Sequence, residues 1–164
     1  RLSISTVFLL QGISMSSLAL SYVINLLARR EYSEFELRNK MQEKAFTEDE
    51  IDETIAHCQK KNWQNDKRFA ENYLHARSQR GYGANRIKQE LRQLKGVSSD
   101  VINEVLVESE INWTEIAERI LRKKFPNYAE PQPIKNKQKI WQYMLSHGFY
   151  SEEFSDFIGN GIED

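Results

Sequence analysis

Residues 144–150 read Met-Leu-Ser-His-Gly-Phe-Tyr, and this turn between two predicted helices has two counterparts earlier in the chain. Residues 41–47 (MQEKAFT) and 94–98 (LKGVS) likewise end an apolar helix, pass a small residue and place one apolar residue before the next helix. The apolar positions that follow are each five residues apart: Phe46 and Ile51, Val97 and Ile102, Phe149 and Phe154. This repetition predicts three copies of one helical unit.

Outward from these turns the chain is predicted to be helical almost throughout, with only three prolines and seven glycines. Ser33 and Thr47 each begin a capping box, and further helix starts are predicted at Asn65 or Asp66, at Ser98 or Ser99, and at Asn112. The remaining predicted helices span 18–30, 135–146 and 152–158, and a proline-bearing loop spans 125–133. No segment alternates with period two for long enough to predict a strand.

The expected fold is therefore all-α, with three tandem three-helix repeats that form an elongated, curved array. The predicted repeats are residues 18–63, 64–110 and 111–164. Units this short are only marginally stable alone, because the core of a domain of fewer than about 40 residues is rarely large enough to stabilise it. Neighbouring units are expected to stabilise one another.

Residues 1–17 are predicted to be an extension outside the repeats. Residues 1–14 (RLSISTVFLLQGIS) are apolar behind one positive charge, lack a signal-peptide cleavage site and are shorter than the roughly 20 residues that span a bilayer. Because helical periodicity begins after Met15, we expect Met15 to be the true start of the protein. Mass spectrometry of the native protein tests this expectation.

Catalytic patterns are absent from the sequence. Cys58 is the single cysteine, which excludes an internal disulfide and favours a reducing, cytoplasmic setting. His57, His75 and His147 lie in no nucleophile or metal-ligand spacing, and no glycine-rich phosphate loop occurs. The sequence therefore predicts a binding protein without catalytic residues, metal or cofactor.

Charge is distributed in blocks, although the net charge is only −1. Basic residues dominate 67–95 and 119–139, and an acidic block at 100–118 separates them. Such blocks suit a track for a polyanion or for an acidic groove on a partner, and solvated helix surfaces that neutralise one another are the alternative. The candidate partner-binding or DNA-binding residues all lie in the first basic block: Arg77, Arg80, Tyr82, Arg86, Lys88, Arg92 and Lys95.

Two expectations concern the geometry of this block. Arg86, Lys88, Arg92 and Lys95 are predicted to share one short helix, with positions 88, 92 and 95 on one face. Gly81 and Gly83 flank Tyr82, so this segment is a loop that projects the tyrosine ring, a glycine helix cap beside a packed tyrosine, or both at once, with Gly81 as the cap and Tyr82 exposed. Phe69 and Tyr73 are expected to pack in a core rather than to stack on bases.

Several segments together resemble the RecX family. The middle-repeat signature of that family is similar to residues 66–70 (DKRFA), 77–91 (RSQRGYGANRIKQEL) and 95–97 (KGV). Residues 33–40 (SEFELRNK) resemble the first repeat, and residues 136–149 resemble the third. Two departures are Ala84, where the family often has proline, and Asn65, where an acidic residue is common; both leave helix formation intact.

The resemblance implies a regulator of the bacterial recombinase RecA that takes part in DNA repair, homologous recombination and the SOS response. Proteins of this family bind the RecA filament on single-stranded DNA and restrain its ATPase, strand-exchange and co-protease activities. The implied partner is the RecA filament, and single-stranded DNA is a second candidate partner, reached through the filament or directly. The chain is expected to be a monomer that does not bind membranes. A helical protein that acts directly on DNA is the alternative function.

Overall fold

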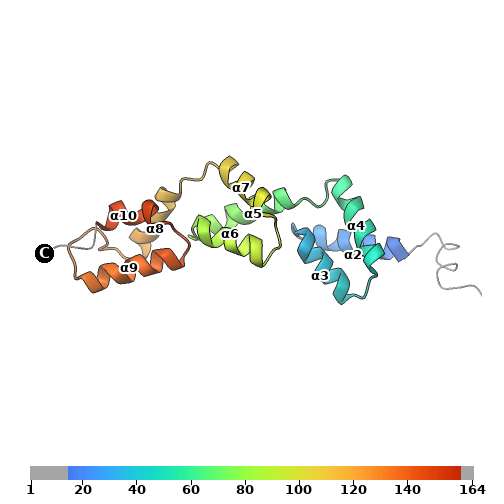
Figure 1. The fold of residues 1–164 in the computed structure, drawn as a ribbon, viewed down its shortest axis with the longest axis horizontal. Helices are drawn as coiled ribbons and strands as arrows, with labels where there is room; N and C mark the ends of the chain where they lie inside the picture. The colour runs from blue at the N-terminus through green and yellow to red at the C-terminus, as the bar shows by residue number, and fades with distance from the viewer. Residues whose placement is uncertain (1–14, 160–164) are drawn as a thin grey trace, which may run out of the picture.

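The computed structural model describes residues 15–159, so residues 1–14 of the predicted extension lie outside the described residues, whereas residues 15–17 belong to the first helix. Between these bounds the chain forms nine helices and no strand. The helices follow one another in three groups along the long axis of the molecule (Figure 1), which confirms the predicted elongated all-α array. Each helix in this part of the chain is too short or too polar to cross a lipid bilayer.

Each group is a unit of three helices. The first unit contains α2 (Met15–Leu27), α3 (Glu34–Glu43) and α4 (Glu48–Lys60). The middle unit contains α5 (Asp66–Gln79), α6 (Ala84–Gln93) and α7 (Ser99–Glu108). The third unit contains α8 (Trp113–Lys124), α9 (Ile134–Ser146) and α10 (Ser151–Ile158).

Polar side chains cap the helix starts as predicted. Ser33 and Thr47 both form complete capping boxes, with Glu36 and Glu50 as their respective partners. Asn65, Ser98 and Asn112 accept hydrogen bonds from the first turns of α5, α7 and α8. These side chains satisfy backbone N–H groups that have no partner within the helix.

The end of the first helix differs from the prediction. The sequence predicted helix to Arg30, whereas α2 ends at Leu27 and the two arginines lie in the following turn. Tertiary contacts explain the difference, because the guanidinium of Arg30 stacks over the ring of Tyr32 at 3.6 Å and donates to Glu36. The charge therefore binds the next helix rather than the end of its own.

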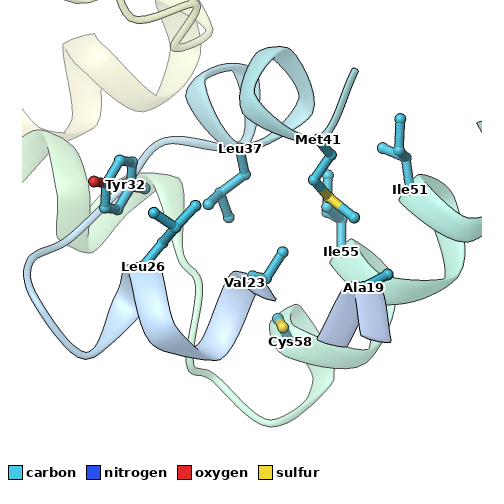
Figure 2. Packing of buried hydrophobic residues seen from close by; sticks show 9 residues of the cluster. All are labelled: Ala19, Val23, Leu26, Tyr32, Leu37, Met41, Ile51, Ile55 and Cys58. Atoms are coloured by element: carbon cyan, nitrogen blue, oxygen red, sulfur yellow. The ribbon is translucent and has the colours of Figure 1, made fainter. Parts of the chain in front are cut away.

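Each unit has its own hydrophobic core. In the first unit, Leu37 and Met41 of α3 face Val23 and Leu26 of α2 (Figure 2), and all four side chains are buried. The middle and third units hold separate clusters of buried residues, centred on α5–α7 and α8–α10. The first and third helices make the most extensive contact in every unit. No described buried cluster spans two units, although Trp113 of α8 packs against the middle cluster, so the contacts at the two unit boundaries determine how the units are placed.

The turns between the second and third helices share one backbone conformation. Ala45, Gly96 and Gly148 occupy the same place in the three units and have positive φ values of 61°, 64° and 94°. This left-handed residue ends the second helix and redirects the chain into the third. The predicted turn repeat thus has a common conformational basis.

Candidate functional site

The boundary between the middle and third units, here the second joint, consists of the α5–α6 turn and the α9–α10 turn. Gly83 N–H donates to the carbonyl of His147 at 2.7 Å, and Asn85 N–H donates to the carbonyl of Gly148 at 3.0 Å. A Cβ atom on Gly83 would overlap the backbone of Gly148. Glycine is therefore required at position 83 for the two backbones to approach.

Aromatic and guanidinium groups stack around Tyr82 at this joint. The guanidinium carbons of Arg77 and Arg86 lie 3.9 and 4.5 Å from the centre of the Tyr82 ring. The His147 ring of the third unit is parallel to the Tyr82 ring, with centroids 5.5 Å apart, and it also stacks on Tyr143 at 3.9 Å. Tyr82 is half-buried, so the packed alternative for this residue holds and the projecting one is wrong.

Glu90 supplies the negative charge for this cluster. Its carboxylate accepts bonds from Arg77 Nε at 2.9 Å and Nη2 at 2.8 Å, and Arg86 Nε lies 3.7 Å away. The Tyr73 hydroxyl donates to the same carboxylate at 3.2 Å. Burial, and next the negative charge of Glu90, raises the pKa of Tyr73 to about 12. Glu90 is the acidic residue of the segment that resembles the family, and it pairs with two of that segment's three arginines, Arg77 and Arg86.

Further contacts from α8 extend the second joint. Arg119 of α8 donates to the carbonyls of Ser78 and Gln79, which lie at the C-terminal end of α5 where a cation is favourable. The side chain of Ile120 occupies the space next to Gly81, which has a φ of 92°. Gly81 thus takes the left-handed position predicted for a helix cap.

The boundary between the first and middle units, here the first joint, is mainly polar. Asp66 accepts a bond from the backbone N–H of Glu34 at 2.9 Å, and Arg68 Nε bonds Glu31 at 2.7 Å. Gln64 is almost fully buried and donates both to the carbonyl of Tyr32 and to Asp66. These bonds hold the linker after α4 and the first turn of α5 against the α2–α3 turn.

A half-buried carboxylate completes the first joint. Glu36 of α3 accepts a bond from Arg30 at 2.7 Å, and Lys95 of the middle unit lies 3.6 Å from the same oxygen. Burial alone would raise the pKa of Glu36, but the hydrogen bonds from Arg30 and from the backbone of Ser33 hold it below its usual value, and the charge of Lys95 adds to this effect. Glu36 is therefore ionised where it binds the middle unit.

The two joints use equivalent positions with opposite charge. Glu36 and Arg86 each lie three residues after the N-cap of the second helix in their unit. Lys95 and His147 each precede the left-handed glycine of the turn that docks there. At these equivalent positions the first joint has an ion pair, whereas the second has a ring stack with backbone hydrogen bonds.

The structure divides the seven candidate residues into two groups. Arg77, Tyr82, Arg86 and Lys95 are engaged within the protein by the contacts above. Arg80, Lys88 and Arg92 have no ion-pair partner among residues 15–159, and Arg80 and Arg92 are exposed. The accessible positive charge of the middle unit is smaller than its sequence suggests.

The predicted shared helix is wrong for one residue. α6 ends at Gln93, so Lys95 lies in the following turn, where it faces Glu36. Leu94, which continues the apolar spacing of Ile87 and Leu91, is 62% exposed because the helix ends before it can turn toward the core. Phe69 is buried and Tyr73 packs against the middle core, as predicted.

The acidic block also binds part of the basic block. Lys67 of α5 forms ion pairs with Glu104 and Glu108 of α7, at 3.0 and 2.9 Å. In the third unit Arg122 pairs with Glu118 on the same helix, whereas Lys123, Lys135 and Lys139 are exposed without an ion-pair partner in the described chain. Charges within the molecule therefore neutralise one another in part. The described chain contains no cluster of three or more His, Cys, Asp or Glu residues that could hold a metal.

His147 and Glu36 are joint residues that the sequence did not identify. The available signal was positional: His147 precedes Gly148 in the repeated turn, as Lys95 precedes Gly96. The repeat pattern does not predict which side chain this turn contacts, because the other half of each joint lies far away in the sequence.

Comparison with known proteins identifies the family of these three units. Models of the first, second and third three-helix domains of RecX match residues 19–58, 65–106 and 111–158. The chain belongs to the RecX family. The suspected resemblance is thereby confirmed, and the signature of the middle RecX domain coincides here with the stacked cluster of the second joint.

Two curated RecX relatives are highly similar over nearly their full length. Regulatory protein RecX of Haemophilus influenzae strain PittEE is 72% identical over 145 residues, which cover 88% of this chain and 95% of that protein. Regulatory protein RecX of Mannheimia succiniciproducens is 67% identical over 150 residues, which cover 92% and 98%.

Two crystal structures of RecX proteins share the fold. One matches with a TM-score of 0.78 at 20% identity, over 96% of this chain and 79% of the other. The RecX structure from Lactobacillus salivarius matches with a TM-score of 0.72 at 22% identity, over 87% and 94%. At these identities the comparison supports the three-unit fold.

Proposed function

We propose that this chain is a non-enzymatic regulator that binds the RecA filament on single-stranded DNA and inhibits its ATPase, strand-exchange and co-protease activities. The observation that carries the proposal is the match of all three units to the RecX family of regulatory proteins. In this proposal the chain acts stoichiometrically, as a cytoplasmic monomer without a cofactor.

The shape of the chain supports a filament as partner. Three equivalent units in a row can meet equivalent surfaces on successive subunits of a helical polymer, and several weak contacts then add up to strong binding. We assign the contact in the middle unit to Arg80, Lys88 and Arg92, whose charges are not neutralised by ion pairs within the described residues. Arg77, Tyr82, Arg86 and Lys95 are excluded from this surface because they serve the joints.

Direct action on DNA is the second candidate function. Lys88 and Arg92 lie one helical turn apart on α6, as in a helix that contacts phosphates. The net charge of −1 and the internal pairing of the other cations favour a protein partner.

RecA ATPase activity on single-stranded DNA, titrated with this protein, tests the proposal. Inhibition that saturates at a fixed ratio to RecA is expected, and unchanged ATPase activity at every ratio would refute it. Binding to duplex DNA without RecA, with a steep dependence on salt concentration, would instead support the DNA-binding alternative.

A further inference from the structure

The placement of the third unit relative to the middle unit depends on a small set of contacts. The buried clusters of these units have no member in common, and apolar packing reaches across the boundary through Ile111 and Trp113, which lie against the middle cluster at the start of the third unit. The second joint adds two backbone hydrogen bonds, the Tyr82–His147 ring pair and the contact of Ile120 with Gly81. A few side chains therefore control the angle between the middle and third units.

Arg86 connects these contacts. It lies over Tyr82 within the middle unit and donates to the carbonyl of Ser146 in the third unit at 3.4 Å. A Cβ atom on Gly148 would overlap Arg86, so the α9–α10 turn fits closely against this residue. The planar guanidinium can stack and donate at the same time, which a lysine cannot do.

We propose that the second joint is a rigid coupling and that Tyr82 and Arg86 are positioning residues rather than contact residues. They hold the free cations of the third unit, Lys123, Lys135 and Lys139, in a fixed relation to Lys88 and Arg92 of the middle unit. The coupling allows one extended polyanionic partner surface to bind both units at once. The identity of that partner rests on the proposed function, whereas the rigidity of the joint does not.

Effective concentration explains why rigidity matters. Once one unit of the chain has bound, the neighbouring unit is already held in the orientation that its own binding surface requires, so it does not have to search for that orientation. A loosened joint keeps every contact residue but loses this advantage, which we expect to weaken binding roughly tenfold.

Distance measurements between spin labels on the full-length chain test the coupling without any partner. Labels at N72C in α5 and D156C in α10 report the distance between units, and labels at N72C and Q89C report a distance within the middle unit. All three positions are exposed, whereas Cys58 is buried and burial raises the pKa of its thiol, so the native cysteine should resist labelling.

The double variant Tyr82→Ala with Arg86→Ala should broaden the distance distribution between units and leave the distribution within the middle unit unchanged. His147→Ala removes the opposite half of the stack from the third unit and should have the same effect, so the test survives if the double variant does not fold. Arg92→Ala removes one free charge and should leave both distributions narrow. Unchanged distributions between units in both joint variants would overturn the proposal.

Binding to RecA filaments on single-stranded DNA then separates positioning from contact. The joint variants should bind roughly tenfold more weakly, with the same salt dependence as the parent, because no phosphate contact is lost. Arg92→Ala should reduce the salt dependence. If the joint variants broaden the distance distribution between units but the parent does not bind the filament, the coupling stands and the proposed function fails. If the distribution broadens and filament binding is not weakened, the positioning role is overturned.

Discussion

The rings of Tyr82 and His147 lie parallel, with 5° between their planes and 5.5 Å between their centroids, although they belong to different units. Burial, and next the positive charges of Arg86 and Lys124, lowers the pKa of His147, while a bond to the Tyr143 carbonyl opposes the shift. The ring is therefore neutral at ordinary pH. A neutral ring can stack beside the nearby guanidinium groups without charge repulsion.

Replacing Glu90 with glutamine should weaken the cluster beside this ring pair. The change removes the charge that Arg77 binds through two hydrogen bonds, so the free energy of unfolding should fall by about 1–3 kcal/mol. The pKa of Tyr73 should move down toward its ordinary value because Glu90 contributes to its elevation. NMR titration of labelled tyrosines measures this pKa. Glu71→Gln, at an exposed position on α5, is the matched control and should change neither quantity.

Glu36 should make stability depend on pH. The pKa of Glu36 is lower in the folded state than in the unfolded state. Its contribution to the free energy of unfolding is therefore complete above the unfolded pKa of about 4.3 and is lost as the pH falls through the folded pKa. Glu36→Gln should therefore cost about 1–2 kcal/mol at neutral pH, and the difference from the parent should shrink in acid.

Denaturant unfolding at a series of pH values measures this difference. Glu43→Gln is the control on the same helix, because Glu43 is exposed and has no ion pair in the described chain. A difference in unfolding free energy between the parent and Glu36→Gln that stays constant into acid would contradict the lowered pKa of Glu36.

Ala45→Gly should stabilise the first unit. Ala45 holds a φ of 61° at the position where the other two units have glycine, and a left-handed alanine costs roughly 1 kcal/mol. Relief of that strain should outweigh the added flexibility of the unfolded chain, for a gain of about 0.5 kcal/mol. Ala56→Gly, on the exposed side of α4, should instead cost about 1 kcal/mol. Equal destabilisation by Ala45→Gly and Ala56→Gly would contradict the hypothesis that the left-handed conformation of Ala45 is strained.

Local patterns predicted the fold well because the repeated turn and the helix caps are short-range features. Ser33, Thr47 and Asn112 act as caps through groups only three residues away. The first helix was predicted too long because the sequence around Arg30 gave no sign of its bond to Glu36. Propensity is a weak guide to where a helix ends, because contacts outside the helix can override it.

The candidate site was less predictable for a physical reason. A basic residue looks the same in sequence whether it faces solvent or a carboxylate from another unit. Lys95 meets Glu36 across the first joint and Arg77 meets Glu90 across two helices, so both belong to the internal structure. Only the three-dimensional arrangement distinguishes Lys95 and Arg77 from Arg92, which is exposed.

Reversing the free charges of the middle unit should weaken partner binding while leaving the fold intact. Lys88→Glu with Arg92→Glu removes no ion pair from the described chain, so the unfolding free energy should stay within about 0.5 kcal/mol of the parent. Inhibition of RecA ATPase should then require at least roughly tenfold more protein, since two favourable contacts with a polyanion become repulsive. Lys60→Glu with Lys61→Glu makes the same change of charge at exposed positions of the first unit and should have a smaller effect. Equal inhibition by the parent and the folded Lys88/Arg92 variant would remove these residues from the contact surface and leave the joints as the sole role of the basic block.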